Sequence, residues 1–330
     1  MKAALLTDIE TLSVAEVAKP VPAAGELLIR VKLAGICGSD SSLFRGKCNV
    51  PFPVIPGHEC VGVVEEINAP GSRFVVGQRV VIQPNLACGT CTMCLKGLKN
   101  VCRSKVRLGI DRNGVFAEYV TVPQSYVWNI PDGLPDEVAV FAEPLAVARH
   151  GLDFAVPKKN DRVLVFGAGV IGQLVLQLAL LTTRNIVACD LSDSRLELAT
   201  QSGARSVKGC ERLSDDCQAG FEIVFETSGS PAALSQAIDL VAPGGTIVLF
   251  GLPAAGHEIR SDVIVRKEIR ILGSIIYVDE FPTVIELLAN GRIATAPLIS
   301  DTIDLEGLAE NLHNFYQPNR IKTLVRIENR

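Results

Sequence analysis

Four cysteines lie within a stretch of fifteen residues, at Cys88, Cys91, Cys94 and Cys102. Four thiolates at such short spacing can close a tetrahedral shell around zinc and leave no open position for chemistry, as structural zinc sites do. The first three also have the spacing of bacterial ferredoxins, but the fourth is too distant and no proline follows it. The spacing therefore favours structural zinc, with an iron–sulfur cluster or free thiols as the alternatives.

Other residues of metal-ligand type are dispersed along the chain. Cys37 follows an apolar run, His58 and Glu59 follow a Pro-Gly pair, and Glu143 precedes a proline. Each has an ordinary explanation: a cysteine after an apolar strand is usually core, a His-Glu pair is usually at the surface, and a Glu-Pro pair often starts a helix. The residues by themselves leave open whether they share a metal ion.

A glycine-rich sequence, Gly167-Ala168-Gly169-Val170-Ile171-Gly172, matches the GxGxxG pattern. It follows an apolar strand-like run and opens an apolar helix-like run, and Asp190 lies eighteen residues after its last glycine. In a dinucleotide site Gly167 permits the tight turn, Gly169 lets the backbone approach the pyrophosphate, and Gly172 lets the helix pack closely. The helix N-terminus, beginning at Val170 and Ile171, then offers N–H groups to the phosphates. This context predicts a dinucleotide site; the alternative is a glycine-rich turn that binds nothing.

Asp190 predicts which coenzyme the site prefers. Its carboxylate can accept hydrogen bonds from the ribose hydroxyls of the adenosine, and it would repel a 2′-phosphate, so NAD is favoured over NADP. Arg195 would soften that preference if it reached the same place. We expect Arg195 on the exposed face of its helix instead.

The elements that position these residues differ between the two parts of the chain. In the first third, short apolar runs are separated by Gly and Pro, as in residues 26–32, 60–67 and 79–82, which predicts a compact, β-rich, barrel-like domain. From about Asp161, apolar strands alternate with helices, which predicts a parallel sheet covered on both faces. The strands are expected at 162–167, 185–190, 221–226, 246–251 and 269–276, with helices at 170–182, 192–203 and 232–241.

The composition excludes several function classes. The chain has 330 residues, 48% hydrophobic and 21% charged, which is the balance of a globular protein. A net charge of −4 without any Lys/Arg-rich run argues against a nucleic-acid or anionic-membrane partner. The apolar segment 163–181 is long enough for a membrane span, but its glycines favour a strand, a turn and a buried helix. We expect a cytoplasmic protein, because the N-terminus lacks a signal-peptide pattern and clustered cysteines suit metal binding in a reducing compartment.

Taken together, these motifs resemble the zinc-containing medium-chain dehydrogenase/reductase superfamily over essentially the whole chain. They follow the family order: Gly-Ile-Cys37-Gly-Ser-Asp, Pro-Gly-His58-Glu59, the four cysteines, Phe116-Ala-Glu-Tyr119, Glu143-Pro144 and the glycine-rich turn. The resemblance implies an α/β protein with a GroES-like, β-rich catalytic domain and a doubly wound, parallel-sheet (Rossmann) nucleotide domain. The catalytic domain would comprise residues 1–145, completed by 280–330, and the nucleotide domain residues 146–279.

The resemblance also assigns the dispersed residues. Cys37, His58 and Glu143 correspond to the ligands of a catalytic zinc, and Glu59 to an alternating or water-mediated ligand. Relatives that act on ethanol carry a cysteine at the place of Glu143, whereas sorbitol, galactitol-phosphate and related polyol dehydrogenases carry this Glu-Pro pair. We therefore expect a zinc-dependent, NAD-linked dehydrogenase that oxidises a secondary hydroxyl of a polyol or sugar-like alcohol.

The expected proton relay follows the resemblance at its first member and departs from it at the next. Ser39, two residues after Cys37, is the expected first member of the proton relay. Many relatives have a histidine five residues after the ligand cysteine, and Ser42 occupies that place here. Candidates for substrate contact near the motifs are Ser42, Phe44, Arg45, Asp111, Arg112 and Glu118.

The alternatives in function are a dehydrogenase of threonine or a simple diol, a zinc-free reductase of the same fold, and a nucleotide-binding regulatory protein without turnover. The resemblance also implies a homo-oligomer, either a dimer or a tetramer. Among the remaining residues, His150 is expected to be structural and His257 and His313 to lie at the surface. The other cysteines are expected to act as small hydrophobic residues: Cys48, Cys60, Cys189, Cys210 and Cys217.

Overall fold

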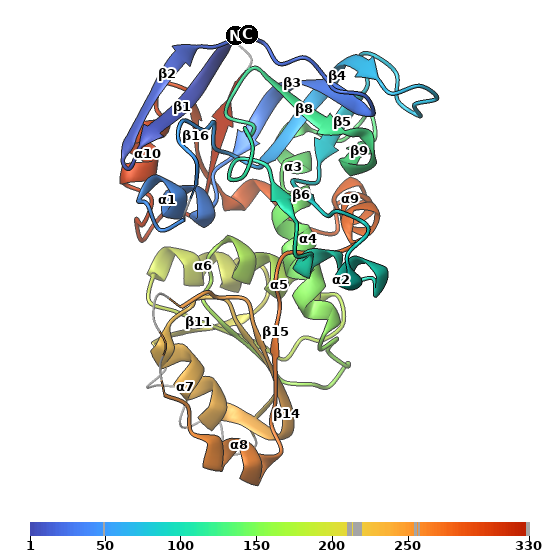
Figure 1. Ribbon diagram of the computed structural model, residues 1–330. Coiled ribbons are helices and arrows are strands. Elements are labelled where there is room, and N and C mark those ends of the chain that lie inside the picture. Colours follow the sequence, from blue (N-terminus) through green and yellow to red (C-terminus); the bar gives the residue numbers. More distant parts are fainter. Residues whose placement is uncertain (49, 210–212, 214–219, 254–255, 257, 328–330) are drawn as a thin grey trace. The chain divides into compact units, whose positions relative to one another are not determined.

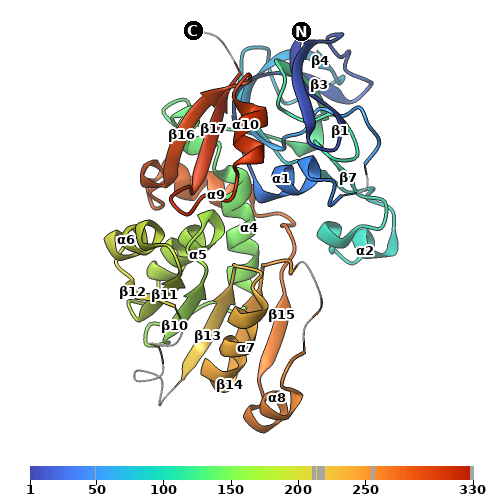
Figure 2. The same cartoon turned by 90° about the vertical axis from the view of Figure 1, so that its left-hand side faces the viewer.

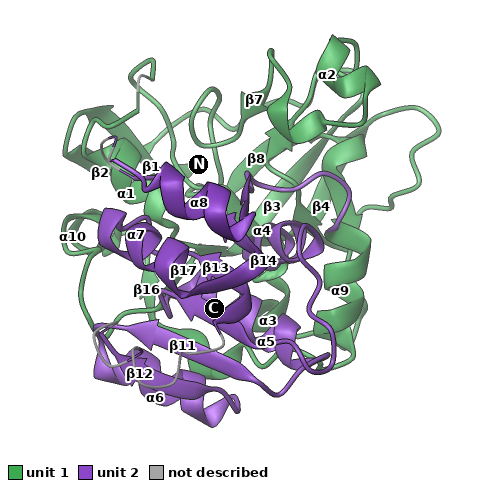
Figure 3. Cartoon of the chain, turned by 90° about the horizontal axis from the view of Figure 1, so that it is seen from below, with its two compact units in different colours: residues 1–143, 281–330 green, residues 144–280 purple. Residues whose placement is uncertain are grey.

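The structure is a computed structural model that describes residues 1–48, 50–209, 213, 220–253, 256 and 258–327. The chain forms two compact units (Figure 3). Unit 1 comprises Met1–Glu143 and Phe281–Arg330, and unit 2 comprises Pro144–Glu280. His257, Cys210 and Cys217 lie outside the described residues.

Unit 1 is built on a seven-stranded, mostly antiparallel sheet (Figure 1). Its strand order is β16-β17-β3-β4-β5-β9, and β8 pairs with β3. The bounds are β3 Glu26–Gly35, β4 Glu59–Asn68, β5 Arg79–Ile82, β8 Tyr119–Pro123, β9 Val127–Asn129, β16 Ile299–Asp304 and β17 Lys322–Arg326. Two smaller sheets complete the strands of this unit: β1 Lys2–Asp8 with β2 Thr11–Glu16, and β6 Asn85–Leu86 with β7 Val106–Arg107.

Strand β3 lies in the interior of the sheet, and seven of its ten residues are buried. It pairs with β4, β8 and β17, and its apolar residues join the core of the unit with Phe116 and Val325. Close pairing with β4 depends on Gly62, since a Cβ there would lie 2.6 Å from the carbonyl oxygen of Arg30. The β-rich domain predicted from the first third of the sequence is confirmed.

The C-terminal segment returns to the sheet of unit 1. It contains α9 Phe281–Ala289, η4 Ala296–Leu298, β16, α10 Leu308–His313 and β17. Strand β17 pairs antiparallel with β3, with Leu324 opposite Gly35. This pairing brings residues near position 322 beside the end of β3, almost three hundred residues earlier in the chain.

The short helices of unit 1 follow strands or lie within its loops. They are α1 Gly38–Phe44, α2 Thr92–Leu95, η1 Lys99–Val101, η2 Gln124–Tyr126 and α3 Asp136–Ala139. Helix α4, Ala142–Asp153, begins in unit 1 and continues into unit 2. Glu143 lies in its first turn.

Unit 2 contains a six-stranded parallel sheet with the order β12-β11-β10-β13-β14-β15 (Figure 2). Helices α5 and α6 form one packed pair, and α7 and α8 form another. The strands are β10 Val163–Phe166, β11 Ile186–Asp190, β12 Arg205–Lys208, β13 Phe221–Glu226, β14 Val241–Leu249 and β15 Arg270–Gly273. The helices are α5 Val170–Leu180, α6 Asp193–Gln201, α7 Pro231–Leu240 and α8 Ser261–Lys267. The strand order reverses between β10 and β13, as in a doubly wound nucleotide-binding fold.

The central strands of unit 2 are apolar because helices cover both faces of the sheet. All four residues of β10 are buried, and Leu164 and Phe166 pack in one core with Phe221 and Val224. The segment that was long enough for a membrane span forms β10, the glycine turn and α5. Within the described ranges, none of the helices combines the length and apolar character of a membrane span.

One strand of unit 2 was not predicted from the sequence, and the predicted limits of other strands were wrong. Strand β12 is an edge strand with the sequence Arg-Ser-Val-Lys, so it carries no apolar run. Strand β14 begins at Val241, before the expected start at position 246. Strand β15 ends at Gly273 rather than Ile276, since the backbone of Ile276 has a φ of 46°, which is incompatible with a strand.

Candidate functional site

The four clustered cysteines converge in one lobe of unit 1. All four sulfur atoms lie within 4.8 Å of one another, and neighbouring pairs are 3.5–4.0 Å apart. A tetrahedral zinc site with Zn–S bonds of about 2.3 Å has sulfur atoms about 3.8 Å apart. The donor set and its spacing therefore fit a closed, structural metal site.

Backbone groups of the lobe already favour thiolates at two positions. Hydrogen bonds from the backbone of Thr90 and Cys91 lower the pKa of Cys88 to about 6, and backbone groups of Cys94 and Arg103 lower the pKa of Cys91. Burial instead raises the pKa of Cys94 to about 12. Amide groups directed at sulfur compensate the negative charge that a metal-thiolate cluster carries, so this local arrangement also fits a metal.

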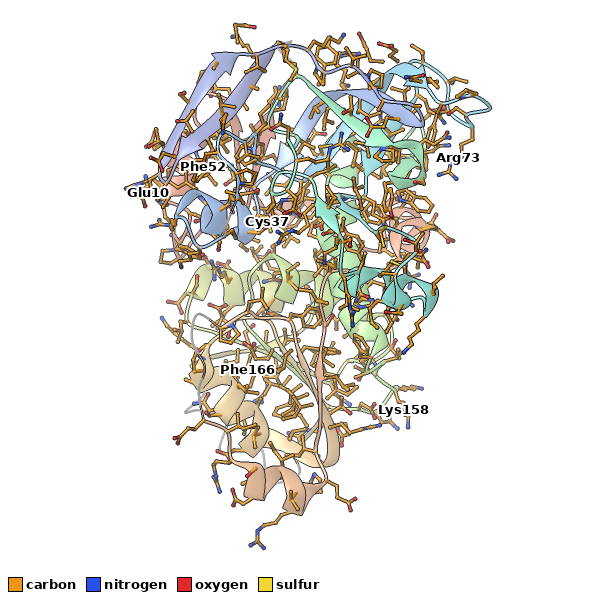
Figure 4. The ribbon with its side chains drawn as sticks, in the orientation of Figure 1. Glu10, Cys37, Phe52, Arg73, Lys158 and Phe166 are labelled. Carbon is orange, nitrogen blue, oxygen red and sulfur yellow. The ribbon has the colours of Figure 1, made fainter. Side chains whose placement is uncertain are left out.

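A second cluster forms where β3 ends and β4 begins. Cys37 follows β3 and precedes α1 (Figure 4), His58 precedes β4, and Glu59 is the first residue of β4. Gly35 lies opposite Glu59 in the antiparallel register, which brings these chain ends together. One ligand atom from each of Cys37, His58 and Glu59 lies within 4.8 Å of the others. A thiol, an imidazole and a carboxylate in this arrangement fit a zinc ion.

Asp40 supports this cluster and was missed by the sequence analysis. Its carboxylate accepts a hydrogen bond from the backbone N–H of Cys37 at 2.8 Å, and its other oxygen lies 3.3 Å from His58 Nδ1. Burial disfavours the protonated form of His58, but Asp40 and Cys37 outweigh burial and hold the pKa of its imidazole well above the usual range. Ser39 Oγ lies 3.4 Å from His58 Nε2.

Lys322 is a second residue that the sequence did not suggest. It lies on β17, its side chain is fully buried, and it forms an ion pair with Glu59, which is 1% exposed. Its Nζ also donates to the carbonyl oxygen of Ile36 at 3.0 Å. Burial lowers the pKa of Lys322, but the charges of Glu59 and Cys37 outweigh it and raise the pKa.

Glycine at position 35 leaves the space for this ion pair. A Cβ on Gly35 would lie 2.8 Å from Lys322 Cε and still closer to the carboxylate of Glu59. The motif Gly35-Ile36-Cys37 therefore has a packing requirement at its first residue. In the sequence, this glycine stands out only as part of a family motif.

Glu143 lies outside the group of ligand atoms that converge within 4.8 Å. It is 7% exposed, and its charge helps to raise the pKa of Lys322. The cluster of Cys37, His58 and Glu59 and the side chain of Glu143 thus share Lys322 as a neighbouring positive charge.

In unit 2 the glycine-rich turn joins β10, whose last residue is Phe166 (Figure 4), to α5. Gly167 has a φ of 86°, which favours glycine, and a Cβ on Gly172 would lie 2.9 Å from the Thr227 hydroxyl oxygen. Gly169 is the N-cap of α5 and offers no side chain to the first-turn amides of Val170 and Ile171. Such amides can bind a phosphate.

Asp190 lies at the end of β11 and contacts this turn. Its carboxylate accepts hydrogen bonds from the backbone N–H groups of Ala168, at 2.7 Å, and Ser192, at 2.8 Å. Arg195, which we expected on the exposed face of α6, is instead half-buried, with Nη1 3.9 Å from Asp190. The guanidinium of Arg195 therefore lies at ion-pair distance from the Asp190 carboxylate.

Most of the residues proposed to contact the substrate instead form hydrogen bonds or ion pairs with other residues of unit 1. Arg112 pairs with Glu26 at 2.9 Å and lines a cavity of about 420 Å³ that includes none of the proposed metal ligands. Asp111 pairs with Arg107, Glu118 accepts the backbone N–H of Lys2, and Arg45 donates to the carbonyl oxygen of His313. Phe44 is buried in the core and Ser42 is half-buried on α1.

The remaining histidines and cysteines in the described ranges have no place in either cluster. His150 Nδ1 lies within hydrogen-bond distance of Glu280 Oε1, at 2.6 Å, and His313 is exposed. Cys60 and Cys189 are buried and Cys48 is half-buried. Burial raises the pKa of the Cys60 thiol, as expected for a cysteine that acts as a small hydrophobic residue.

Two sequence-family models match the chain. The alcohol dehydrogenase GroES-like domain matches residues 23–132, and the zinc-binding dehydrogenase domain matches residues 170–290. The first match covers strands of the unit 1 sheet and the four-cysteine lobe, and the second covers most of unit 2.

Among curated proteins, the chain is 34% identical over 330 residues to the starvation-sensing protein RspB of Escherichia coli K12, with 97% of each chain covered. It is 34% identical over 307 residues to the L-threonine 3-dehydrogenase of Chelativorans sp. BNC1, covering 88% of this chain and 85% of that one. It is 32% identical over 323 residues to the sorbitol dehydrogenase of Bacillus subtilis 168, covering 93% and 91%.

Solved structures agree with these similarities. RspB of Escherichia coli CFT073, complexed with NADH, superposes with a TM-score of 0.93 at 34% identity and covers 99% of each chain. A zinc-binding dehydrogenase of Sinorhizobium meliloti 1021, bound to NADP, superposes with a TM-score of 0.93 at 32% identity and covers 98% of each chain. The two neighbours thus hold different coenzymes.

Proposed function

The chain belongs to the family of zinc-dependent alcohol dehydrogenases, and on this basis we propose that it oxidises a secondary hydroxyl of a polyol or sugar-like alcohol with NAD. The convergence of Cys37, His58 and Glu59 where β3 and β4 meet is the observation that carries the proposal. The Glu143-Pro144 pair, typical of polyol dehydrogenases, supports the substrate class. Unit 1 is the proposed catalytic domain and unit 2 the proposed nucleotide-binding domain.

In the proposed site, Cys37 and His58 would hold the catalytic zinc together with Glu143, whose side chain lies outside the converged ligand atoms, and Glu59 would be its alternating or water-mediated ligand. A bound zinc supplies a Lewis acid that lowers the pKa of a hydroxyl group. The charges of a Cys37 thiolate and a Glu143 carboxylate balance a divalent ion, so Glu59 would make the site anionic. The ion pair with Lys322 offsets that extra charge.

The neighbouring residues orient the site and move the proton. Asp40 holds the imidazole of His58 and the backbone of Cys37 in one geometry. The Ser39 hydroxyl borders the cluster and is the proposed first acceptor of the substrate proton. Because Ser42 replaces the usual histidine, the proton continues through water, the coenzyme ribose or another side chain.

The nucleotide site is proposed to bind NAD through the glycine-rich turn. The first-turn amides of α5 would bind the pyrophosphate, and Asp190 would accept hydrogen bonds from the ribose hydroxyls with the lone pairs that Ala168 and Ser192 leave available. The Asp190 carboxylate disfavours a 2′-phosphate. Arg195, 3.9 Å from it, reduces this preference, so we expect slow use of NADP as well.

A threonine or simple diol dehydrogenase is the second candidate. It is favoured by the 34% identity to L-threonine 3-dehydrogenase over most of the chain. The zinc and nucleotide sites would be the same, and only the residues that contact the substrate would differ. We also propose a structural zinc in the four-cysteine lobe and a homo-oligomeric enzyme.

The test is NADH formation by zinc-replete protein with polyols, cyclitols, phosphorylated polyols, threonine and simple diols. Strong turnover of one polyhydroxylated compound, abolished by Cys37→Ser, supports the proposal. Turnover of threonine or a diol alone replaces the polyol assignment with the second candidate. No turnover of any compound by protein that binds zinc and NAD contradicts the proposed function.

A further inference from the structure

Glu226 is a buried carboxylate to which the reaction outlined above assigns no role. It is the last residue of β13 and is 2% exposed. Its Oε1 accepts hydrogen bonds from the backbone N–H groups of Ser228, at 2.8 Å, and Gly229, at 3.0 Å, and from the Ser228 hydroxyl. Its Oε2 accepts from the Gly229 N–H at 3.2 Å. Buried carboxylates are costly unless such donors surround them.

The backbone of the same segment ties two further loops to this position. The carbonyl oxygen of Glu226 accepts the N–H of Phe250 at 2.8 Å, just after β14. The hydroxyl of Thr227 donates to the carbonyl oxygens of Phe166 and Gly167, at 2.9 and 2.8 Å, where the glycine-rich turn begins. Residues 226–227 therefore connect the loops that follow β10, β13 and β14.

These loops approach one another too closely for any side chain. A Cβ on Gly251 would lie 2.4 Å from Gly229 Cα and 2.7 Å from Glu226 Oε2. A Cβ on Gly167 would lie 3.0 Å from the amide nitrogen of Ser228. The positive φ of Gly229, 68°, helps to turn successive N–H groups toward one point, as in the backbone nests that bind anions.

The position of this network in the sheet relates it to coenzyme binding. Ligands of doubly wound sheets bind at the carboxyl ends of the strands, where the strand order reverses. In unit 2 the order reverses between β10 and β13, the strands that end at Phe166 and Glu226. The network thus lies beside the first turn of α5, whose amides carry no side-chain cap.

We propose that Glu226 is an internal anion that positions the dinucleotide site. By accepting the donors of Ser228 and Gly229, it keeps the loop after β13 in its binding conformation before the coenzyme arrives. It also saturates these amides, so that the amides of α5 are the ones left for the pyrophosphate. This inference rests on the proposed nucleotide site and makes Glu226 a positioning residue, since it acts through the loops.

The expected consequence is a change in coenzyme affinity without a change in the chemical step. In Glu226→Gln, the amide oxygen can take the place of Oε1, but an NH₂ group would face the Gly229 N–H at the place of Oε2 and the negative charge is lost, so this loop would be less ordered in the free protein. Binding would then have to order the loop, which weakens affinity. Once the coenzyme is bound, the loop and the zinc site are the same as in the wild type.

The experiment compares Glu226→Gln with Glu222→Gln by titration with NADH and by steady-state kinetics. Glu222 lies at the other end of β13 and also accepts a backbone N–H, from Arg162 at 2.7 Å, so it is a matched control. We expect Glu226→Gln to raise the Kd for NADH and the KM for NAD about ten-fold, with kcat and zinc content within about two-fold of the wild type. Glu222→Gln should match the wild type.

Several results would overturn the inference. One is an unchanged Kd in folded Glu226→Gln protein, and another is an equal rise in both variants. If Glu226→Gln does not fold, Glu226→Asp replaces it, because its carboxylate is withdrawn by one methylene group, and a wild-type Kd there contradicts the proposal. Wild-type protein that binds neither NADH nor NADPH would instead overturn the proposed function, and this inference with it.

Discussion

In the four-cysteine lobe, every sulfur comes from a stretch of fifteen residues, and backbone amides of the same stretch surround it. In the second cluster, Cys37 and the His58-Glu59 pair come from the ends of two paired strands, and Lys322 comes from the far end of the chain. The lobe therefore depends on local turns, whereas the second cluster depends on the completed sheet. Perturbing long-range contacts should damage the second cluster and spare the lobe.

The largest effect is expected for Lys322→Met. This change leaves the carboxylate of Glu59 buried without its partner, which should cost about 3–5 kcal/mol in the free energy of unfolding. Urea unfolding measures the loss, and zinc analysis should show that the lobe keeps its metal in the folded fraction. The double variant Glu59→Gln/Lys322→Met should recover most of the stability. Equal stability of Lys322→Met and wild type would contradict the role of the ion pair.

Ser39→Ala should separate proton transfer from metal binding. If the Ser39 hydroxyl accepts the substrate proton, kcat should fall about a hundred-fold, with zinc content and NADH affinity unchanged. Steady-state rates between pH 6 and 10 measure the effect. Full turnover across that range would remove Ser39 from the proton path, and Ser42→Ala then becomes the next variant to compare.

Asp40→Asn should weaken the second cluster without affecting the lobe. Loss of a carboxylate that orients a metal-ligating histidine costs about 10–100-fold in metal affinity. Competition with a chelator should detect one weakened site and one unchanged site per chain. If both sites weaken equally, the two clusters are coupled, and the contrast drawn between them is wrong.

The pH dependence of metal binding should reflect the raised pKa of His58. Only the neutral imidazole can bind zinc. A raised pKa therefore means that protonation of His58 begins to compete with zinc binding at a higher pH. Zinc affinity of the second cluster should therefore fall as the pH drops below that pKa, by about ten-fold per pH unit for the proton on His58 alone. Chelator competition with Cys102→Ser protein, whose lobe is disabled, measures this cluster alone. Affinity independent of pH from 5 to 8 would contradict the prediction.

The smallest effect is expected for Thr90→Val in the lobe. The Thr90 hydroxyl donates to Cys88 Sγ at 3.7 Å, but backbone N–H groups also hold this sulfur. Zinc affinity of the lobe should change by less than about three-fold. A change as large as that of Asp40→Asn would show that the lobe depends on individual side chains as strongly as the second cluster does.

Features made by neighbouring residues could be predicted from the sequence. The cysteine spacing predicted a lobe whose sulfur atoms converge, and the glycine-rich turn was predicted with β10 and α5 around it. Both features are local, because residues that are close in the sequence must also lie close together in space. The polar edge strand β12 was missed because it carries no apolar signal.

Only the tertiary structure revealed which distant residues support these sites. Lys322 and Glu59 form an ion pair although they are 263 positions apart in the sequence. Glycine is required at position 35 because a Cβ there would clash with both side chains. Asp40 belongs to the Cys37 motif and Glu226 ends an expected strand, but an acidic residue in a sequence does not show which amides will point at it. Motif spacing fixes which donors can meet by local geometry, whereas strand pairing and burial decide which charges must be neutralised and by which partner.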